Sequence, residues 1–286
     1  MVTRVHPTFW LALGIAAVFG FAREFFMLTA AVTLHEMTHV IMGLVFHARV
    51  TEFIITPLGE TAVIKGLERK PPGVRAAVIL AGPALNLAIG YLGVRVFNVT
   101  DFAMPEKGLG PGYFFAANIA LGAFNLLPAF PLDGGRFCQM VLGNIIGAAR
   151  ANRLLCGISR FFAVLLIAAG VVQLTLFSYN ISLYCIGVYI IKNLPREQLK
   201  LSFEFFCYFS PGRGADQRIT PIKFFTVTSQ SSMEDLIDCL RWDTFSVFNI
   251  YFENGGTASF SERDLMRHIK ENGLTGRAGE LVYEEF

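Results

Sequence analysis

The stretch AVTLHEMTHVIMGLVF, Ala31 to Phe46, decides how this chain is interpreted. Most of its residues are apolar, yet His35, Glu36 and His39 stand in its middle. Such a composition suits a helix inside a membrane, where ionisable groups are costly and are functional by default. The surrounding sequence should therefore describe a membrane protein with a site built on this helix.

The composition is that of a membrane protein with a soluble end. Of 286 residues, 53% are hydrophobic and 16% charged, against about 25% charged in soluble domains. Long apolar runs fill the first part of the chain, whereas charges are interspersed near its end. We predict a transmembrane domain at 1–198, a linker at 199–218 and a cytoplasmic domain at 219–286.

Charge and cysteine usage exclude other classes of protein. The net charge is +2, and neither a basic stripe nor finger-like spacing is present, so no nucleic-acid partner is expected. The cysteines are odd in number and scattered, which predicts reduced thiols rather than a disulfide framework. They are Cys138, Cys156, Cys185, Cys207 and Cys239.

The apolar runs predict an α-helical polytopic membrane protein with about six transmembrane helices, since one span needs about 20 apolar residues. Predicted inside segments carry most of the Lys and Arg, whereas the outside turns carry Arg23, Arg95 and Lys107. This asymmetry predicts both termini in the cytoplasm. The first apolar run is read as a retained helix rather than a signal peptide. The spans are 7–22, 25–46, 74–97, 112–130, 157–177 and 179–192, the first and last being short.

Between the second and third spans lies ARVTEFIITPLGETAVIKGLE, residues 48–68. The segment alternates, is rich in Thr, Val and Ile, and has a turn sequence at residues 57–59. This pattern predicts a small cytoplasmic β-hairpin. An irregular loop is the alternative.

His35-Glu36-Met37-Thr38-His39 has the H-E-x-x-H pattern. Residues i and i+4 share one helix face, so both imidazoles can reach one metal ion, with Glu36 placed to take a proton from water. A hydrogen-bonded polar cluster between helices is the alternative. His47 lies off this face, and His6 and His268 are expected to be solvated.

A catalytic zinc site needs a third protein ligand and leaves one position for water. The candidate is Asp133, in FNLLPAFPLDGGR from Phe124 to Arg136. Pro128 and Pro131 predict a broken helix before it, which is tolerated at membrane depth where the backbone lines a watery cavity. The alternative is that Asp133 is a turn residue at a helix end.

AGPALN, Ala81 to Asn86, places Gly82 and Pro83 in the middle of the third span. Asn86 and Asn125 are amides within apolar helices. They are candidates for binding a substrate strand or an oxyanion, and equally for hydrogen bonding between helices.

Together these three motifs resemble the site-2 protease family of intramembrane zinc metalloproteases, peptidase family M50B. The matching segments are H-E-x-x-H at 35–39, G-P-x-x-N at 82–86 and N-x-x-P-x-x-P-L-D-G-G at 125–135. The resemblance implies that His35, His39 and Asp133 bind one Zn2+ and that Glu36 is the catalytic base. It implies that Asn125 and Asn86, with Pro128 and Pro131, position substrate or an oxyanion. Thr38 departs from the glycine that the family often has.

The whole-chain pattern resembles the sporulation branch of this family. That resemblance implies a membrane-associated pro-sigma factor as substrate, inhibitory membrane partner proteins, and the mother-cell membrane around the forespore as location. A single-span anti-sigma factor is the alternative substrate. A membrane metal transporter and an inactive binding platform are the rival functions.

The sequence from residue 220 predicts strand, amphipathic helix, strand, tight turn, strand and helix. It resembles a single cystathionine-β-synthase (CBS) motif of α/β type. Such motifs pair, which implies a homo-oligomer through CBS pairing. Ser261 and Asp264 match the position where CBS motifs often hold the ribose of ATP or another adenine nucleotide, and a scaffold without ligand is the alternative.

The predicted chemistry is hydrolysis of a peptide bond by metal-activated water. Glu36 would take a proton from the water and pass it to the leaving amine. The substrate must be an extended strand, since a helix hides its carbonyls. It would pair with the broken backbone near Pro128 and Pro131 or with the 48–68 hairpin.

Overall fold

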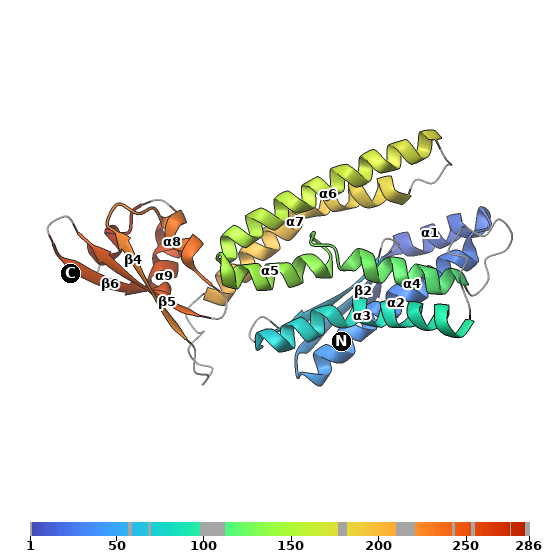
Figure 1. Cartoon of the computed structure of the whole chain (residues 1–286), viewed down its shortest axis with the longest axis horizontal. Coiled ribbons are helices and arrows are strands. Elements are labelled where there is room, and N and C mark those ends of the chain that lie inside the picture. The colour runs from blue at the N-terminus through green and yellow to red at the C-terminus, as the bar shows by residue number, and fades with distance from the viewer. Residues whose placement is uncertain are drawn as a thin grey trace. The chain divides into compact units, whose positions relative to one another are not determined.

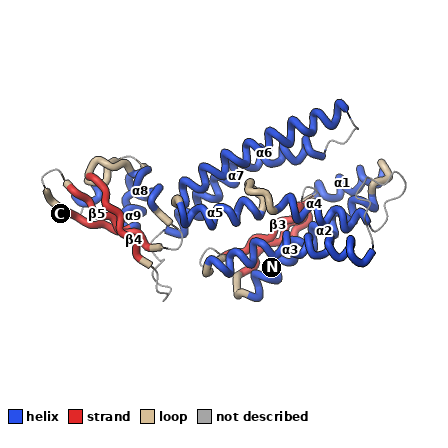
Figure 2. The backbone as a smooth tube through the Cα atoms, in the orientation of Figure 1, coloured by secondary structure: helices blue, strands red, loops and turns tan. Residues whose placement is uncertain are grey.

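The computed structural model describes residues 2–56, 59–67, 70–97, 112–176, 182–209, 221–241, 244–252, 255–274 and 276–283. These residues form mostly helices with two small sheets (Figures 1 and 2). They pack as two compact units, Met1–Leu127 with Leu132–Gly134, and Pro128–Pro131 with Gly135–Phe286.

The first unit joins four helices to a three-stranded sheet. The helices are α1 (Pro7–Val18), α2 (Ala22–Val45), α3 (Pro72–Phe97) and α4 (Gly112–Asn125). The sheet has the order β1-β2-β3, formed by Val2–Val5, Arg49–Thr56 and Gly59–Lys65. Strands β2 and β3 are antiparallel, which is the predicted hairpin, although residues 57 and 58 of its turn lie outside the described residues. Strand β1, which was not predicted, pairs parallel to β2.

Glycines allow helices α3 and α4 to approach closely. A Cβ atom built on Gly93 would lie 2.1 Å from the Phe115 ring, and one on Gly90 would lie 2.2 Å from Ile119. Small residues at helix contacts are the usual means of packing helices in a membrane. Helix α2 packs against both α3 and α4, and against β3. The helix with the two histidines is therefore the centre of this unit.

The second unit contains the remaining helices and a second sheet. Helices α6 (Ala148–Leu176) and α7 (Ser182–Phe209) run side by side (Figure 1), and α5 (Asp133–Ile145) precedes them. Helix α5 was not predicted, and α6 begins before the expected residue 157. Helix α7 continues through residues 199–209 of the predicted linker, while 210–218 lie outside the described residues.

The C-terminal elements follow the predicted order of strand, helix, strand, strand and helix. They are β4 (Ile222–Thr228), α8 (Met233–Cys239), β5 (Phe245–Tyr251), β6 (Thr257–Ser261) and α9 (Glu262–Asn272), followed by the short α10 (Glu280–Tyr283). Strand β4 is parallel to β5, and β5 is antiparallel to β6. Phe248 and Ile250 of β5 are fully buried in a core with Leu236 and Leu265 of the two helices. The CBS assignment stays a prediction.

Within the second unit, the C-terminal domain contacts the start of α6. The backbone N–H of Ala148 donates to the Leu240 carbonyl at 3.0 Å. The Asp238 carboxylate lies 3.1 Å from Arg150 Nε and 2.6 Å from Arg153 Nη2. Gly147, with φ of 98°, approaches Asp238 so closely that a Cβ atom would lie 2.1 Å from its carbonyl oxygen.

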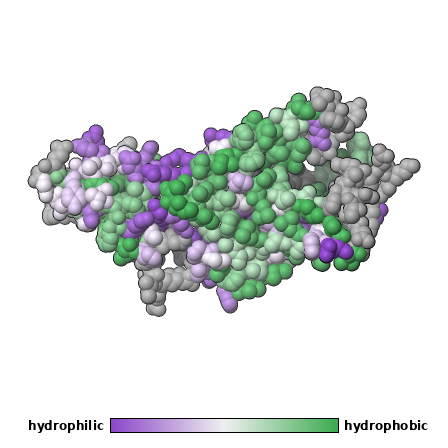
Figure 3. Space-filling model, viewed as in Figure 1, coloured by the Kyte–Doolittle hydropathy of each residue, from purple (hydrophilic) through white to green (hydrophobic). Residues whose placement is uncertain are grey.

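The chain is an integral membrane protein, as its apolar helices indicate. Among the described residues, Ala22–Val45, Pro72–Val96 and Ala148–Leu174 are long and apolar enough to cross a membrane, and Pro7–Val18 and Leu183–Pro195 are shorter apolar helices. Apolar residues cover much of the helix surface in Figure 3. Val18 and Phe161, for example, are 84% and 66% exposed, as expected for side chains that face lipid. Six spans and cytoplasmic termini stay predictions.

Candidate metal centre

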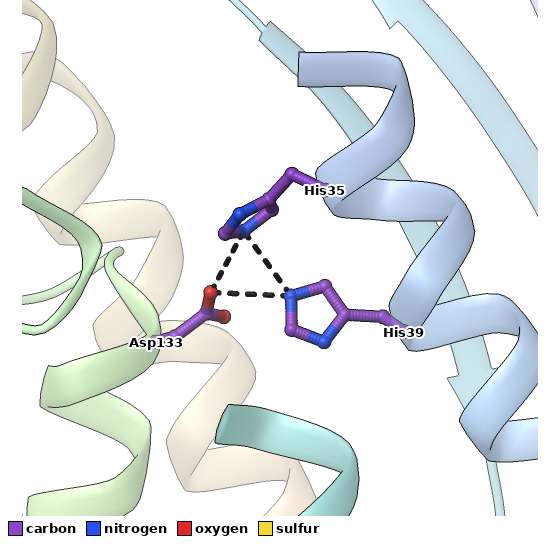
Figure 4. A group of neighbouring side chains, drawn as sticks. All are labelled: His35, His39 and Asp133. Atoms are coloured by element: carbon purple, nitrogen blue, oxygen red, sulfur yellow. Dashed lines mark hydrogen bonds and ion pairs between the residues drawn. The ribbon is translucent and has the colours of Figure 1, made fainter. Parts of the chain in front are cut away.

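Two histidines on α2 form the first half of the site. His35 and His39 are buried, and their Nε2 atoms lie 3.2 Å apart. The four-residue spacing puts both rings on one helix face, as Figure 4 shows. Both rings turn the same nitrogen toward a single point, which is the arrangement that a shared metal ion requires.

Asp133 completes a triangle with these two nitrogens. Its Oδ2 atom lies 3.0 Å from His35 Nε2 and 3.2 Å from His39 Nε2 (Figure 4). Asp133 is the first residue of α5, where the helix dipole favours a carboxylate. It therefore meets the histidines from a different helix, 94 residues further along the chain than His39.

The break before α5 places this carboxylate. Helix α4 ends at Asn125, and residues 126–132 are not helical, as Pro128 and Pro131 predict. A Cβ atom on Gly134 would lie 2.3 Å from the Leu126 carbonyl oxygen, so only glycine lets the chain fold back over the first turn of α5. Phe130 is fully buried, and its N–H donates to the Ser159 hydroxyl at 2.7 Å.

The triangle has the dimensions of a tetrahedral zinc site. Zinc binds imidazole nitrogen and carboxylate oxygen at about 2.0–2.1 Å, so two ligand atoms of a tetrahedron lie about 3.3 Å apart. The three observed separations are 3.0, 3.2 and 3.2 Å. Among the described residues, His35, His39 and Asp133 are the group of side chains that fits a metal ion. Three ligands leave one position for water or substrate.

Helix α3 closes the side of the site behind the histidines. His39 Nδ1 lies 2.7 Å from the Val78 carbonyl, and His35 Nδ1 lies 3.2 Å from Asn86 Oδ1. Between these two contacts, a Cβ atom on Gly82 would lie 2.4 Å from His39 Nε2. The roles of Val78 and Gly82 were not predicted, although residues 78, 82 and 86 share a four-residue spacing.

Comparison with known proteins agrees with this geometry. The family model of Peptidase family M50 matches residues 104–169, which include Asp133 and the break before it. This part of the chain is similar to peptidase family M50. The matched residues contain Asp133 of the donor set, and the similarity supports a metalloprotease.

The individual relatives are zinc metalloproteases and a sporulation protein. Zinc metalloprotease MJ0392 of Methanocaldococcus jannaschii is 26% identical over 75% of this chain and 59% of its own length. Stage IV sporulation protein FB of Bacillus subtilis is 25% identical over 68% of this chain and 65% of its length. Putative zinc metalloprotease Rip3 of Mycobacterium tuberculosis is 31% identical over 51% and 38%. The chain thus spans less than two thirds of each of these relatives.

The fold is similar to that of a solved site-2 protease. The site-2 protease from Methanocaldococcus jannaschii superposes with a TM-score of 0.53 and 24% sequence identity, over 68% of this chain and 89% of that one. This likeness supports the fold of the helices and the small sheet.

The other residues predicted from the M50 resemblance lie at different places. Glu36 follows His35 on α2 and is half-buried. The Asn125 amide donates to the Leu121 carbonyl of its own helix at 3.1 Å, and Pro128 and Pro131 lie in the break. The Thr38 hydroxyl donates to the Leu34 carbonyl at 2.7 Å, so this polar side chain is satisfied within α2. The catalytic and substrate-positioning roles stay predictions.

Ser261 and Asp264 are bonded to each other at the start of α9. The Ser261 side chain accepts from the Asp264 N–H, and the Asp264 carboxylate accepts from the Ser261 backbone, a capping box. Burial alone would raise the pKa of Asp264. The hydrogen bonds from Ser261 and the charges of Arg267 and Arg263 together outweigh burial, so the pKa is below its ordinary value. These contacts give the pair a structural role, and nucleotide binding stays a prediction.

Two of the remaining histidines differ from each other in exposure. His6 is exposed and caps α1 by accepting from the Thr8 N–H. The expectation that His268 is solvated was wrong, because it is 6% exposed and its Nδ1 lies 3.2 Å from Asn272 Nδ2. Neither of these histidines belongs to the metal group.

Proposed function

We propose that this chain is an intramembrane zinc endopeptidase. The observation that carries the proposal is the triangle of His35, His39 and Asp133, whose ligand atoms lie 3.0–3.2 Å apart beside an apolar helix bundle. A zinc ion bound there would polarise a water molecule and a peptide carbonyl.

The chain's own residues supply the rest of the chemistry. Glu36, adjacent to His35 on α2, would take a proton from the attacking water and pass it to the leaving amine. The buried histidines hold their Nε2 atoms toward the ligand position, 3.0 and 3.2 Å from the Asp133 carboxylate.

We propose that the substrate binds as an extended strand. Its support is β3, the terminal strand of the described sheet, which packs against the helix that carries the histidines. An exposed strand edge can hydrogen-bond an added peptide strand. This arrangement would present the peptide carbonyls that a helical substrate hides.

We propose a membrane-associated pro-sigma factor as the substrate, with the mother-cell membrane as location and membrane proteins as inhibitory partners. The support is the similarity to stage IV sporulation protein FB and the domain pattern. A single-span anti-sigma factor is the second candidate substrate, because the similarity is not confined to the sporulation protein: zinc metalloprotease MJ0392 is similar over a comparable part of this chain.

We also propose that the C-terminal domains pair between two chains. The outward face of the second sheet supports this, because Ile222, Phe224 and Tyr251 are 58%, 66% and 55% exposed there. Burial of this apolar face against a second copy would remove it from water.

The test is cleavage of a co-expressed pro-sigma factor by the wild-type chain, Glu36→Gln and Glu24→Gln. Glu24 is the matched control because it lies on the same helix, twelve residues before Glu36 and about 18 Å along it. We expect cleavage by the wild type and Glu24→Gln, and zinc retention without cleavage by Glu36→Gln. Cleavage by Glu36→Gln would contradict the mechanism. Metal transport or partner binding that survives Glu36→Gln, without cleavage by the wild type, would favour a transporter or a binding platform.

A further inference from the structure

Three residues of α3 face the two histidines at a regular spacing. Val78, Gly82 and Asn86 follow one another every four residues, so they lie along one face of the helix. Their partners on α2 also lie four residues apart, in the opposite chain order. Val78 contacts His39, and Asn86 contacts His35. The two helices therefore pair residue by residue along the metal site.

Val78 orients His39 through its backbone. The Val78 carbonyl lies 2.7 Å from His39 Nδ1, and a carbonyl oxygen can only accept a hydrogen bond. His39 Nδ1 must therefore carry the proton, which leaves the lone pair on Nε2. That nitrogen is the one 3.2 Å from Asp133.

Asn86 provides the corresponding contact to His35. Its Oδ1 atom lies 3.2 Å from His35 Nδ1, and the residue is 0% exposed. If the amide nitrogen faced His35 instead, the proton of His35 would move to Nε2 and block the metal position. The carbonyl oxygen of Asn86 is thus the end that suits a metal ligand.

The amide of Asn86 has no alternative structural role among the described residues. Its Nδ2 atom is buried without a hydrogen-bond partner there. Asn118, on α4, is equally buried, but its Nδ2 donates to the Phe114 carbonyl of its own helix at 2.7 Å. Burying an amide with an unmet donor is unfavourable. The hydrogen bond to His35 is therefore the contact that explains an asparagine at position 86.

We propose that the Val78–Gly82–Asn86 face of α3 sets the tautomer and orientation of both zinc ligands, with Asn86 as the positioning residue for His35. This differs from the expectation that Asn86 contacts substrate or an oxyanion, and it agrees with the alternative that the amide hydrogen-bonds between helices. It rests on the proposed function only in that a zinc ion occupies the triangle. Residues that hydrogen-bond the outer nitrogen of a ligating histidine fix its ring and raise its basicity.

The experiment measures zinc binding by the purified full chain in detergent, independently of proteolysis. Zinc affinity is measured by competition with a chelator, and the cobalt(II) form is followed by its absorption spectrum. The variants are Asn86→Leu, which removes the acceptor at similar size, and Asn86→Asp, which keeps an acceptor. Asn118→Leu is the matched control for the loss of a buried amide.

We expect Asn86→Leu to weaken zinc binding by about 10- to 100-fold and to change the cobalt spectrum. Asn86→Asp should restore most of the affinity, and Asn118→Leu should bind zinc as the wild type does. Wild-type affinity and spectrum in Asn86→Leu would overturn the inference, as would equal losses in all three variants. A wild-type chain that binds no zinc would refute the proposed function instead.

Discussion

A methyl group at Gly82 should disable the metal site, because the position leaves no space for it. A Cβ atom there would lie 2.4 Å from His39 Nε2, 2.8 Å from His39 Cε1 and 2.9 Å from His35 Cε1. Ordinary carbon contacts are about 3.5–4.0 Å, so the His39 ring must retreat by about 1 Å. His39 is held on its other side by the Val78 carbonyl at 2.7 Å.

The expected effect on stability follows from a comparison with Gly157. Gly157 lies exposed on α6 with nothing within 4 Å of an added Cβ. Replacing a helical glycine with alanine stabilises a helix by about 1 kcal/mol, and this gain is common to both variants. Overpacking costs about 1–3 kcal/mol, so Gly82→Ala should be less stable than Gly157→Ala by that amount.

The expected effect on function is a loss of cleavage rate. A displacement of about 1 Å in a catalytic group costs about 100-fold in rate, so Gly82→Ala should cleave at least that much more slowly. Thermal unfolding in detergent, zinc retention against a chelator and substrate cleavage measure the three quantities. Zinc retention and cleavage like those of Gly157→Ala would refute the argument that backbone contact at Gly82 shapes the site.

Two further predictions concern the C-terminal domain. Asp238→Asn should lower the free energy of unfolding of the second unit by about 1 kcal/mol at low salt and by less at high salt. The reason is that Asp238 pairs with Arg150 and Arg153, whose side chains are exposed and therefore screened by salt. Equal effects on thermal unfolding at both salt concentrations would contradict this. The folded-state pKa of Asp264 is lowered, so its contribution is present above the unfolded-state value of about 3.9 and is lost as pH falls through the folded-state pKa. Unfolding of Asp264→Asn between pH 2 and 6 should therefore lack this part of the acid destabilisation, and a pH profile matching the wild type would show that the capping carboxylate contributes nothing.

Prediction of the helices succeeded where hydropathy was high and failed where it was mixed. Helices α2 and α3 lie close to the predicted 25–46 and 74–97. Helix α5 was missed because DGGRFCQMVLGNI mixes polar and apolar residues, and the first turns of α6 carry Arg150 and Arg153. Cys138 and Leu142 of α5 pack against the core formed by α6 and α7, and a hydropathy window does not detect such packing.

The candidate site divides in the same way between local and distant information. The spacing of His35 and His39 is local, since a helix puts i and i+4 on one face. Asp133 was identified through its place after Pro128 and Pro131 and through the family resemblance. Its separation from the histidines, by contrast, depends on how α4 ends and α5 begins.

By itself, the sequence determined an apolar helix with a metal-binding spacing, a proline-broken segment before an aspartate, and a C-terminal run of strands and helices. These features follow from composition and from periods of two and about four residues. Only the tertiary structure decided that the Val78 carbonyl and Asn86 hold the outer nitrogens of the histidines and that Gly82 lies against them. A backbone carbonyl is the same for every residue type, so its partner emerges only when α2 and α3 pack together.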